Sequence, residues 1–309
     1  SERLMLEPSR FWVERTVRPV YKVKQDEQAL SATLVQAPST PVILPGCIAG
    51  ESLLSQIIVD KFLYHLPEYR QAKRFKELGV EISTSSMNRW VHATADKLYG
   101  LYAAQMERVL SAGYIQVDET THPITDRPGS ARKGYIWVVR SVLVPGVFFY
   151  YDKGSRSGEV VLKMLKGYQG ALQTDGYAAY SIFEEKKGVL PLGCMAHVRR
   201  KFENALTTTP EAKPALDYIA LLYMLEGNLR AEGADWEQIR REREEKAYPI
   251  LQQMEICIQQ ACNNCTPKSP LGKAISYAFG MWPRISRYCK EGYFQIDNNG
   301  VENAIRPLV

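Results

Sequence analysis

Three acidic residues in this chain are placed as the ligands of a divalent metal ion would be. Asp118 ends the strand-like run YIQVD, Asp175 ends the strand-like run ALQTD, and Glu302 lies in the first turn of a predicted helix. The ends of neighbouring parallel strands lie about 5 Å apart, so we expect the two aspartates to converge, and a helix packed on that edge adds Glu302. Carboxylates this close repel one another, and Mg²⁺ or Mn²⁺ relieves the repulsion.

Such a carboxylate cluster points to chemistry on phosphodiesters. Two metal ions about 3.5–4 Å apart activate a water or a 3′-hydroxyl and stabilise the leaving oxygen. Taken alone, each acid also has an ordinary explanation, because an aspartate at a strand end is commonly a turn residue and a glutamate in a first turn complements the helix N-terminus. The hypothesis of a metal site therefore depends on the order of the elements that carry these residues.

The order of elements around the acids predicts an α/β fold. Runs of β-branched and aromatic residues predict strands at 114–118, 134–144, 146–152, 171–175 and 189–196. Helices are predicted after the third strand, near 177–186, and from His197 onward. The resulting order, βββαβαβα with an acid ending the first and fourth strands, is that of a ribonuclease H-like fold. Connection rules favour a mixed sheet in which the first, fourth and fifth strands run parallel.

The rest of the chain is predicted to be mostly helical. We predict an extended arm at 1–45, a helical DNA-binding unit at 46–111, the ribonuclease H-like core at 112–206, a helical insertion at 207–291, and a return to the core at 292–309. The helical unit consists of two short helices, a glycine turn and a longer third helix, which is compatible with a helix-turn-helix. In that case Asn88 and Arg89 would face the major groove, although an architectural three-helix bundle fits the same pattern.

Four ordered blocks resemble the signature blocks of the insertion sequence 66 family of bacterial transposases. They are YIQVDETTH, LQTDGYAAY, GCMAHVRRKF and IDNNGVENAIRPLV. The helical stretch ahead of the core is similar as well, so the likeness covers roughly residues 10–309. Family members usually have Trp where this chain has Met195, which we interpret as a packing substitution.

The resemblance implies a DDE-type transposase, a polynucleotidyl transferase and nuclease. It makes Asp118, Asp175 and Glu302 the catalytic and metal-binding triad, with two Mg²⁺ or Mn²⁺ ions as cofactors. It implies cleavage at transposon ends followed by strand transfer, so the expected partner is double-stranded DNA, with a homo-oligomer and accessory transposition proteins as further partners. Family members typically add an N-terminal coiled coil with a zinc-binding region and a basic C-terminal tail, and we expect this chain to lack most of both.

Two other functions are compatible with the same residues. A ribonuclease H-like nuclease would cut DNA without joining it, and a non-catalytic transposase remnant would bind DNA without cutting. Detection of strand-transfer products separates the first alternative from a transposase, and Mn²⁺ binding at the triad separates the second.

Basic residues near the acids are candidates for DNA contact. The predicted helix after the fifth strand begins with His197, Arg199, Arg200 and Lys201, and Arg306 lies one turn beyond Glu302. An ordinary solvated helix explains the first four residues equally well.

Four further neighbours of the two aspartates have structural interpretations. Glu119 and His122 are interpreted as loop residues rather than as additional ligands, and Tyr177 and Tyr180 as buried residues of an amphipathic helix rather than as a stacking platform for a base.

The composition is that of a globular chain: 45% of the residues are hydrophobic and 24% are charged, and the net charge of +5 leans only weakly toward polyanions. No run approaches the roughly 20 apolar residues that span a bilayer. We therefore expect no membrane partner and a cytoplasmic, nucleoid-associated protein. Cys257, Cys262 and Cys265 lack a nearby fourth ligand, so this cluster is not predicted to bind zinc.

Overall fold

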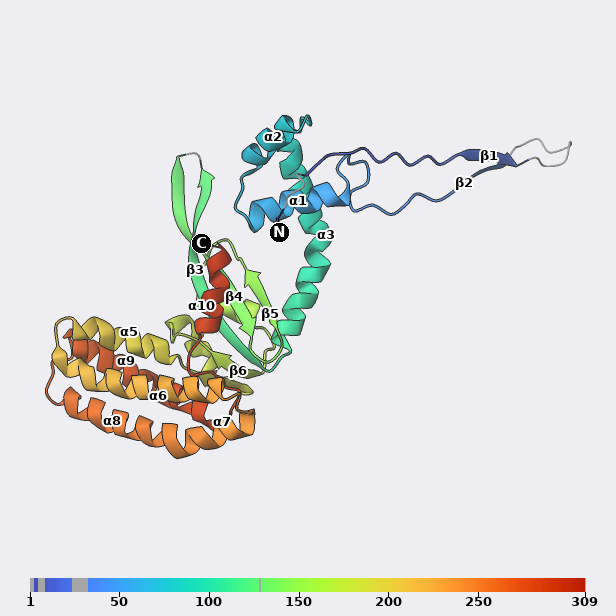
Figure 1. Cartoon of the computed structure of the whole chain (residues 1–309). Coiled ribbons are helices and arrows are strands. Elements are labelled where there is room, and N and C mark those ends of the chain that lie inside the picture. The colour runs from blue at the N-terminus through green and yellow to red at the C-terminus, as the bar shows by residue number, and fades with distance from the viewer. Residues whose placement is uncertain (1–2, 5–8, 24–32, 128, 309) are drawn as a thin grey trace. The chain divides into compact units, whose positions relative to one another are not determined.

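The computed structural model describes residues 3–4, 9–23, 33–127 and 129–308 (Figure 1). The chain divides into two compact units, Ser1–Leu101 and Tyr102–Val309. The long helix α3 (Thr84–Leu110) begins in the first unit and ends in the second. Among the described residues, no helix has both the length and the apolar character that crossing a membrane would require.

The first unit is built on three helices. These are α1 (Glu51–Phe62), α2 (Glu68–Glu77) and the first part of α3. Their apolar residues form one small core. The arm, predicted only as extended, also contains a pair of antiparallel strands, β1 (Val20–Val23) and β2 (Thr33–Gln36), and its Phe11 ring meets Phe75 of the helical core at 5.2 Å.

The second unit contains a five-stranded mixed sheet in the order β5-β4-β3-β6-β7. The strands are β3 (Tyr114–Arg127), β4 (Ser130–Ser141), β5 (Gly146–Tyr150), β6 (Gly170–Gln173) and β7 (Val189–Leu192). β3 pairs in parallel with β6, and β6 in parallel with β7, whereas β4 is antiparallel to both of its neighbours. The predicted α/β class and the parallel arrangement of the first, fourth and fifth strands are confirmed.

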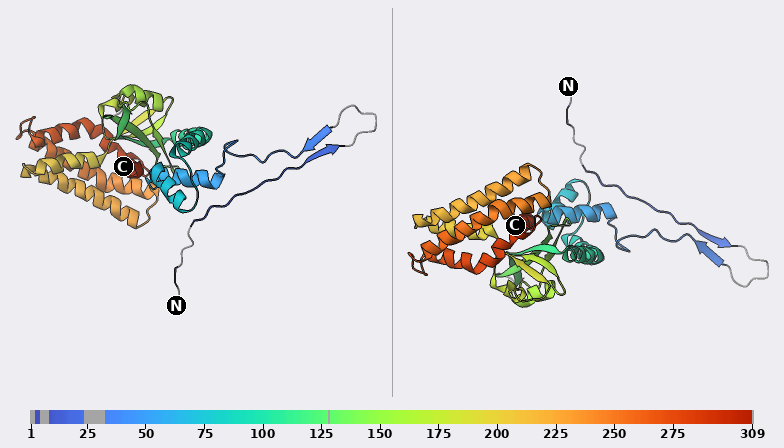
Figure 2. Two further views of the ribbon diagram at one scale, coloured as in Figure 1. Left: turned by 90° about the horizontal axis from the view of Figure 1, so that it is seen from above. Right: turned by 90° about the horizontal axis from the view of Figure 1, so that it is seen from below.

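Helices cover both faces of the sheet. One face is covered by α4 (Gly158–Met164), the 3-10 helix η1 (Ala178–Phe183) and the last turns of α3. The other face is covered by α5 (Met195–Leu206) and the long helices that follow it (Figure 2). Because side chains alternate along a strand, Tyr114 and Gln116 of β3 point to the second face and Ile115 and Val117 to the first.

The chain between β7 and its C-terminal end is almost wholly helical. The helices after α5 are α6 (Lys213–Ala231), α7 (Trp236–Glu242), the π-helical turn η3 (Arg243–Ala247), α8 (Tyr248–Cys262), α9 (Pro270–Ile285) and α10 (Asn299–Ile305), with 3-10 turns at Pro210–Ala212, Ser286–Lys290 and Arg306–Leu308. Ser269 caps α9, because its hydroxyl accepts a hydrogen bond from the Gly272 amide.

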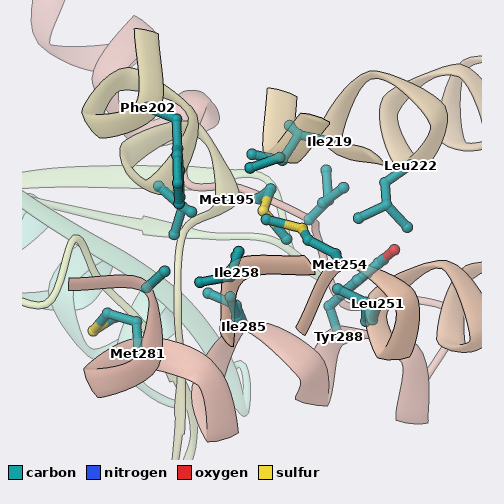
Figure 3. Packing of buried hydrophobic residues seen from close by; sticks show 14 of the residues in the cluster. Met195, Phe202, Ile219, Leu222, Leu251, Met254, Ile258, Met281, Ile285 and Tyr288 are labelled. Atoms are coloured by element: carbon teal, nitrogen blue, oxygen red, sulfur yellow. The ribbon is translucent and has the colours of Figure 1, made fainter. Parts of the chain in front are cut away.

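The long helices share one hydrophobic core with the sheet. Met195 and Phe202 of α5 pack with Met281 and Ile285 of α9, and residues of α6 and α8 complete the cluster (Figure 3). Tyr114 of the sheet belongs to the same core. The helices between α5 and α10 are therefore anchored to the face of the sheet toward which Gln116 points.

Several predicted boundaries were wrong. β3 does not end at Asp118 but continues to Arg127, because β4 starts earlier than predicted and provides a partner for the polar residues that follow. Glu119 and His122 are consequently strand residues rather than loop residues. β6 ends two residues before Asp175, and β7 ends at Leu192 rather than at 196.

Candidate active site

Asp118 lies on β3 opposite Val138 of β4, two residues beyond the last parallel pair with β6. Its Oδ1 accepts a hydrogen bond of 2.8 Å from the Glu119 amide. Burial, together with the negative charges of Glu119, Asp175 and Glu302, raises the pKa of Asp118 to about 7. The carboxylate is thus in a poorly solvated place and close enough to both other acids of the predicted triad to be repelled by them.

Asp175 lies in the turn between β6 and η1. Its Oδ1 accepts a hydrogen bond of 2.8 Å from the Tyr177 amide, and its carbonyl oxygen accepts one from the Tyr277 hydroxyl of α9. The first contact shapes the turn, as aspartates commonly do, and the second ties the turn to the helical insertion. One contact therefore holds the side chain of Asp175 and the other its backbone, beside the end of β6.

Glu302 lies in the first turn of α10, which packs against β3 and β4. Its Oε2 is 3.6 Å from Arg200 Nη2, and its Oε1 is 3.8 Å from His197 Nδ1. Both of these ligand-type atoms, His197 Nδ1 and Glu302 Oε1, are buried and have no hydrogen-bond partner. Residues from the start of α5 therefore surround the carboxylate of Glu302.

The protonation of His197 follows from its neighbours. Burial lowers the pKa of His197, although the carboxylates of Asp175 and Glu302 oppose that shift. Arg200 Nη1 lies 3.4 Å from His197 Nε2, and because a guanidinium only donates, Nε2 must be the acceptor in this contact. The neutral ring then carries its proton on Nδ1, facing Glu302.

Asp175 and Glu302 are both near enough to Asp118 to act on it electrostatically. Among the residues that the structure describes, no group of three His, Cys, Asp or Glu side chains is close enough to hold a metal. The donor set itself suits Mg²⁺ or Mn²⁺, since it consists of carboxylate oxygens, and Glu302 Oε1 is buried without a partner. The chemistry of these donors therefore fits such an ion.

A network of buried amides positions this site, and our sequence analysis missed it. The Oε1 of Gln173 accepts hydrogen bonds from the Tyr114 hydroxyl at 2.7 Å and from Gln116 at 2.9 Å, while its Nε2 donates to the carbonyls of Gly193 and Gln295. Gln116 also donates to the carbonyl of Asp297. The network joins β3 and β6 to the segment that leads into α10.

A signal for this network was present in the sequence. Gln116 and Gln173 each stand two positions before an acid of the triad, inside an otherwise apolar strand. Residues two apart on a strand point to the same face of the sheet, so each glutamine is expected on the face toward which its aspartate points. A buried amide needs several partners, and the returning chain supplies them.

Arg156 and Glu119 form a second cluster that was not predicted. Arg156 Nε and Nη2 both bond to Glu119 Oε1, the Tyr180 hydroxyl donates to Glu119 Oε2 at 3.0 Å, and the guanidinium stacks 3.8 Å from the centre of the Tyr177 ring. The Glu119 side chain is only 3% exposed. Arg156 therefore partly compensates the charge of Glu119, a carboxylate that still repels Asp118.

Residues 46–309 match the family model described as the IS66 family of transposases. The chain belongs to the IS66 transposase family. The match includes all three acids and the helices between them.

Three curated relatives from Sinorhizobium fredii resemble the whole chain. The uncharacterized protein y4jD is 30% identical over 325 residues, covering 100% of this chain and 62% of that protein. The uncharacterized proteins y4qI and y4hP are 31% and 30% identical, covering 99% and 100% of this chain and 59% of each relative. The IS66-family chain thus spans about three fifths of the length of these relatives.

The basic residues predicted near the triad lie in different surroundings in this IS66-family chain. Arg200 and His197 are at Glu302, whereas Arg199 pairs with Glu203 at 3.2 Å. Lys201 lies over the ring of Tyr277, 5.5 Å from its centre. Arg306 is exposed at the end of α10.

Asn88 and Arg89 belong to the first unit and lie exposed on α3. Asn88 donates to Glu68 of α2 at 3.4 Å, and Arg89 to Ser86 at 3.3 Å. Cys257, Cys262 and Cys265 are free thiols at the end of α8 and just beyond it.

Replacement of Gln173 by Leu is expected to destabilise the second unit by about 3 kcal/mol or more, because it leaves several buried polar groups without partners. Urea unfolding followed by fluorescence measures the change. Gln169→Leu, at a site that faces outward before β6, is the control and is expected to change stability by less than about 0.5 kcal/mol. Equal effects of the two substitutions would contradict the role of the network.

Proposed function

We propose that this chain is the catalytic core of a DDE-type transposase with a ribonuclease H-like fold. Membership of the IS66 family supports the reaction class. The sheet order β5-β4-β3-β6-β7, with β3, β6 and β7 parallel, supports the fold. The observation that carries the proposal is that the half-buried carboxylate of Asp118, on the first of these strands, is repelled by the charges of both Asp175 and Glu302.

Asp118, Asp175 and Glu302 would hold Mg²⁺ or Mn²⁺, with two ions expected. When bound, such ions activate a water or a 3′-hydroxyl and stabilise the leaving oxygen of a phosphodiester. The chain itself supplies the positioning of the acids: Gln116 and Gln173 fix the segment leading into α10, and the Tyr177 amide holds the Asp175 carboxylate. No covalent intermediate with the protein is required.

His197 and Arg200 support the position of Glu302. The neutral imidazole directs its Nδ1 proton toward Glu302 Oε1, and the guanidinium balances the charge of the same carboxylate. If Glu302 turned to a bound ion, Arg200 would be released to contact a DNA phosphate. Arg199, Lys201 and Arg306 belong to the same proposal as further DNA contacts.

Double-stranded DNA is the proposed substrate, as transposon ends and as target. We further propose that the three-helix part of the first unit binds DNA through α3, with Asn88 and Arg89 directed to the major groove, and that the region between α5 and α10 is a helical insertion in the core. A homo-oligomer and accessory transposition proteins belong to the same proposal.

The function is tested by incubating the purified chain with duplexes that carry the ends of its own element, in the presence of Mg²⁺ or Mn²⁺. We expect nicks at the element ends and covalent joining of the freed 3′ ends to target DNA, both abolished by EDTA. Hydrolysis without joined products would indicate a nuclease instead. Duplex binding without cleavage under any metal would contradict a catalytic role for this chain.

A further inference from the structure

The hairpin of β3 and β4 extends well beyond the sheet to which it belongs. β6 pairs only with residues 114–116 of β3, and β5 pairs only with residues 137–141 of β4. Within the described part of the chain, residues 119–127 and 130–136 thus pair with each other and with no third strand. We call this two-stranded part the β3–β4 ribbon, and Figure 1 shows it projecting past the other strands of its unit.

The ribbon is braced against the loop that follows β5. Ile124 Cδ1 lies only 2.1 Å from the position that a Cβ of Gly134 would occupy and 2.4 Å from that of Gly154, so both glycines are needed for its packing. Arg132 Nη1 and Nη2 lie 3.3 and 3.2 Å from the Lys153 carbonyl oxygen, to which they donate. A ribbon held in this way can present a surface at a fixed distance from the sheet.

The exposed surface of the ribbon is polar and basic. Its exposed side chains include Thr121, His122, Thr125, Arg132 and Lys133. Glu119, the one acid among the ribbon side chains that the structure describes, is 3% exposed and paired with Arg156. The exposed side chains that the structure describes on the ribbon thus offer hydroxyl, imidazole and cationic groups, which suit the phosphates and base edges of DNA.

The edges of the ribbon argue against a further strand as its partner. Pro123 lies on the β3 side opposite Lys133 on the β4 side. Proline removes a backbone donor, and lysine on an edge strand disfavours pairing with a second sheet. A second copy of the chain is therefore a poorer occupant than a polyanion.

We infer that the β3–β4 ribbon enters a major groove of the duplex whose phosphodiester lies at Asp118. This inference rests on the proposed function and adds to it a DNA-contacting element. The major groove is about 12 Å wide and admits a two-stranded ribbon. β3 runs without interruption from Asp118 to Ile124, a span of about 20 Å at about 3.3 Å per residue. At about 3.4 Å per base pair, the ribbon contacts the duplex about six base pairs from the scissile position.

The test uses Lys133, because Arg132 also braces the ribbon. Duplex binding by Lys133→Ala is measured by fluorescence anisotropy over a series of salt concentrations, in an Asp118→Asn background that prevents cleavage. We expect Lys133→Ala to bind duplex DNA more weakly. The slope of a plot of log K against log salt concentration should be shallower by about one. Lys133→Arg should restore both, and Lys166→Ala, an exposed lysine after α4, should change neither.

Hydroxyl-radical footprinting of the same proteins gives the position of the contact. Protection about six base pairs from the cleavage site should be lost in Lys133→Ala and kept in Lys166→Ala. The inference would be overturned if the salt dependence and the footprint of Lys133→Ala were identical to those of the Asp118→Asn parent. It would also be overturned if that parent failed to bind duplex DNA.

Altered self-association of Lys133→Ala in sedimentation, with DNA binding unchanged, would assign the ribbon to contact with a second copy of the chain. Cleavage by the wild-type chain with unchanged binding by Lys133→Ala would overturn the ribbon alone and leave the proposed function standing.

Discussion

Replacement of Asp118 by Asn is expected to lower the rate of metal-dependent DNA cleavage by about a thousandfold or more. The substitution keeps the shape of the side chain but removes the charge that, in our proposal, holds a metal ion together with Asp175 and Glu302. Stabilisation of transition-state charge by a metal is worth several kcal/mol, and each 1.36 kcal/mol corresponds to a factor of ten in rate. Single-turnover cleavage of labelled duplex measures the loss.

The same substitution should not destabilise the fold. Asp118 is repelled by three carboxylates and is largely withdrawn from water, so Asn at this position removes an unfavourable interaction. We expect an unchanged or higher melting temperature in the absence of metal. Asp96→Asn, at an exposed position of α3, is the matched control and should retain cleavage. Cleavage at wild-type rates by Asp118→Asn would refute its assignment to the triad.

Replacement of Arg243 by Met is expected to cost about 3–5 kcal/mol of stability, because it breaks a buried ion pair by removing one partner. Arg243 Nε and Nη2 each lie 2.7 Å from an oxygen of Glu226, and the two side chains are 2% and 9% exposed. Nη1 donates to the carbonyls of Tyr288, Glu291 and Gly292. The substitution leaves a buried carboxylate and three carbonyl oxygens without this donor.

Two further variants separate charge from packing. Arg240→Met removes an arginine of neighbouring α7 that pairs with Glu237 and Glu244 at the surface, and we expect a change below about 1 kcal/mol. The double variant with Glu226→Gln and Arg243→Met should recover part of the loss, because the uncompensated charge is gone. Urea unfolding of the four proteins provides the comparison. Equal destabilisation by Arg240→Met and Arg243→Met would contradict this account of the buried pair.

The order of elements around the sheet could be predicted from the sequence. The role of the three acids as a metal-binding triad stays a prediction. Alternating apolar residues in YIQVD and ALQTD predict strands, and the parallel pairing of β3 with β6 brings the turn after β6 to the side of Asp118. The first unit also has the predicted two short helices, glycine turn and longer third helix, with α2 ending two residues before Gly79. Local periodicity and short-range connection rules suffice for features of this kind.

The remaining features depend on partners that are distant in the sequence. The polar residues after Asp118 have the composition of a loop, and they form a strand because β4 lies beside them. Glu119 is buried because Arg156, 37 residues later, neutralises it. The contacts of Glu302 with His197 and Arg200 join α10 to a helix on the other side of the insertion. Local sequence patterns do not predict contacts between residues so far apart in the chain. The glutamines two positions before Asp118 and Asp175, in contrast, could have predicted the buried amide network.

The central claim is that Asp118, Asp175 and Glu302 form one metal-binding site. It is tested most directly by a crystal structure of the chain in Mn²⁺, with the ions located by anomalous scattering. We predict at least one peak bound by carboxylate oxygens of both Asp118 and Asp175 at about 2.0–2.2 Å, with Glu302 turned away from Arg200 toward it. Saturating Mn²⁺ with no peak at these carboxylates, or peaks only at other residues, would contradict the claim.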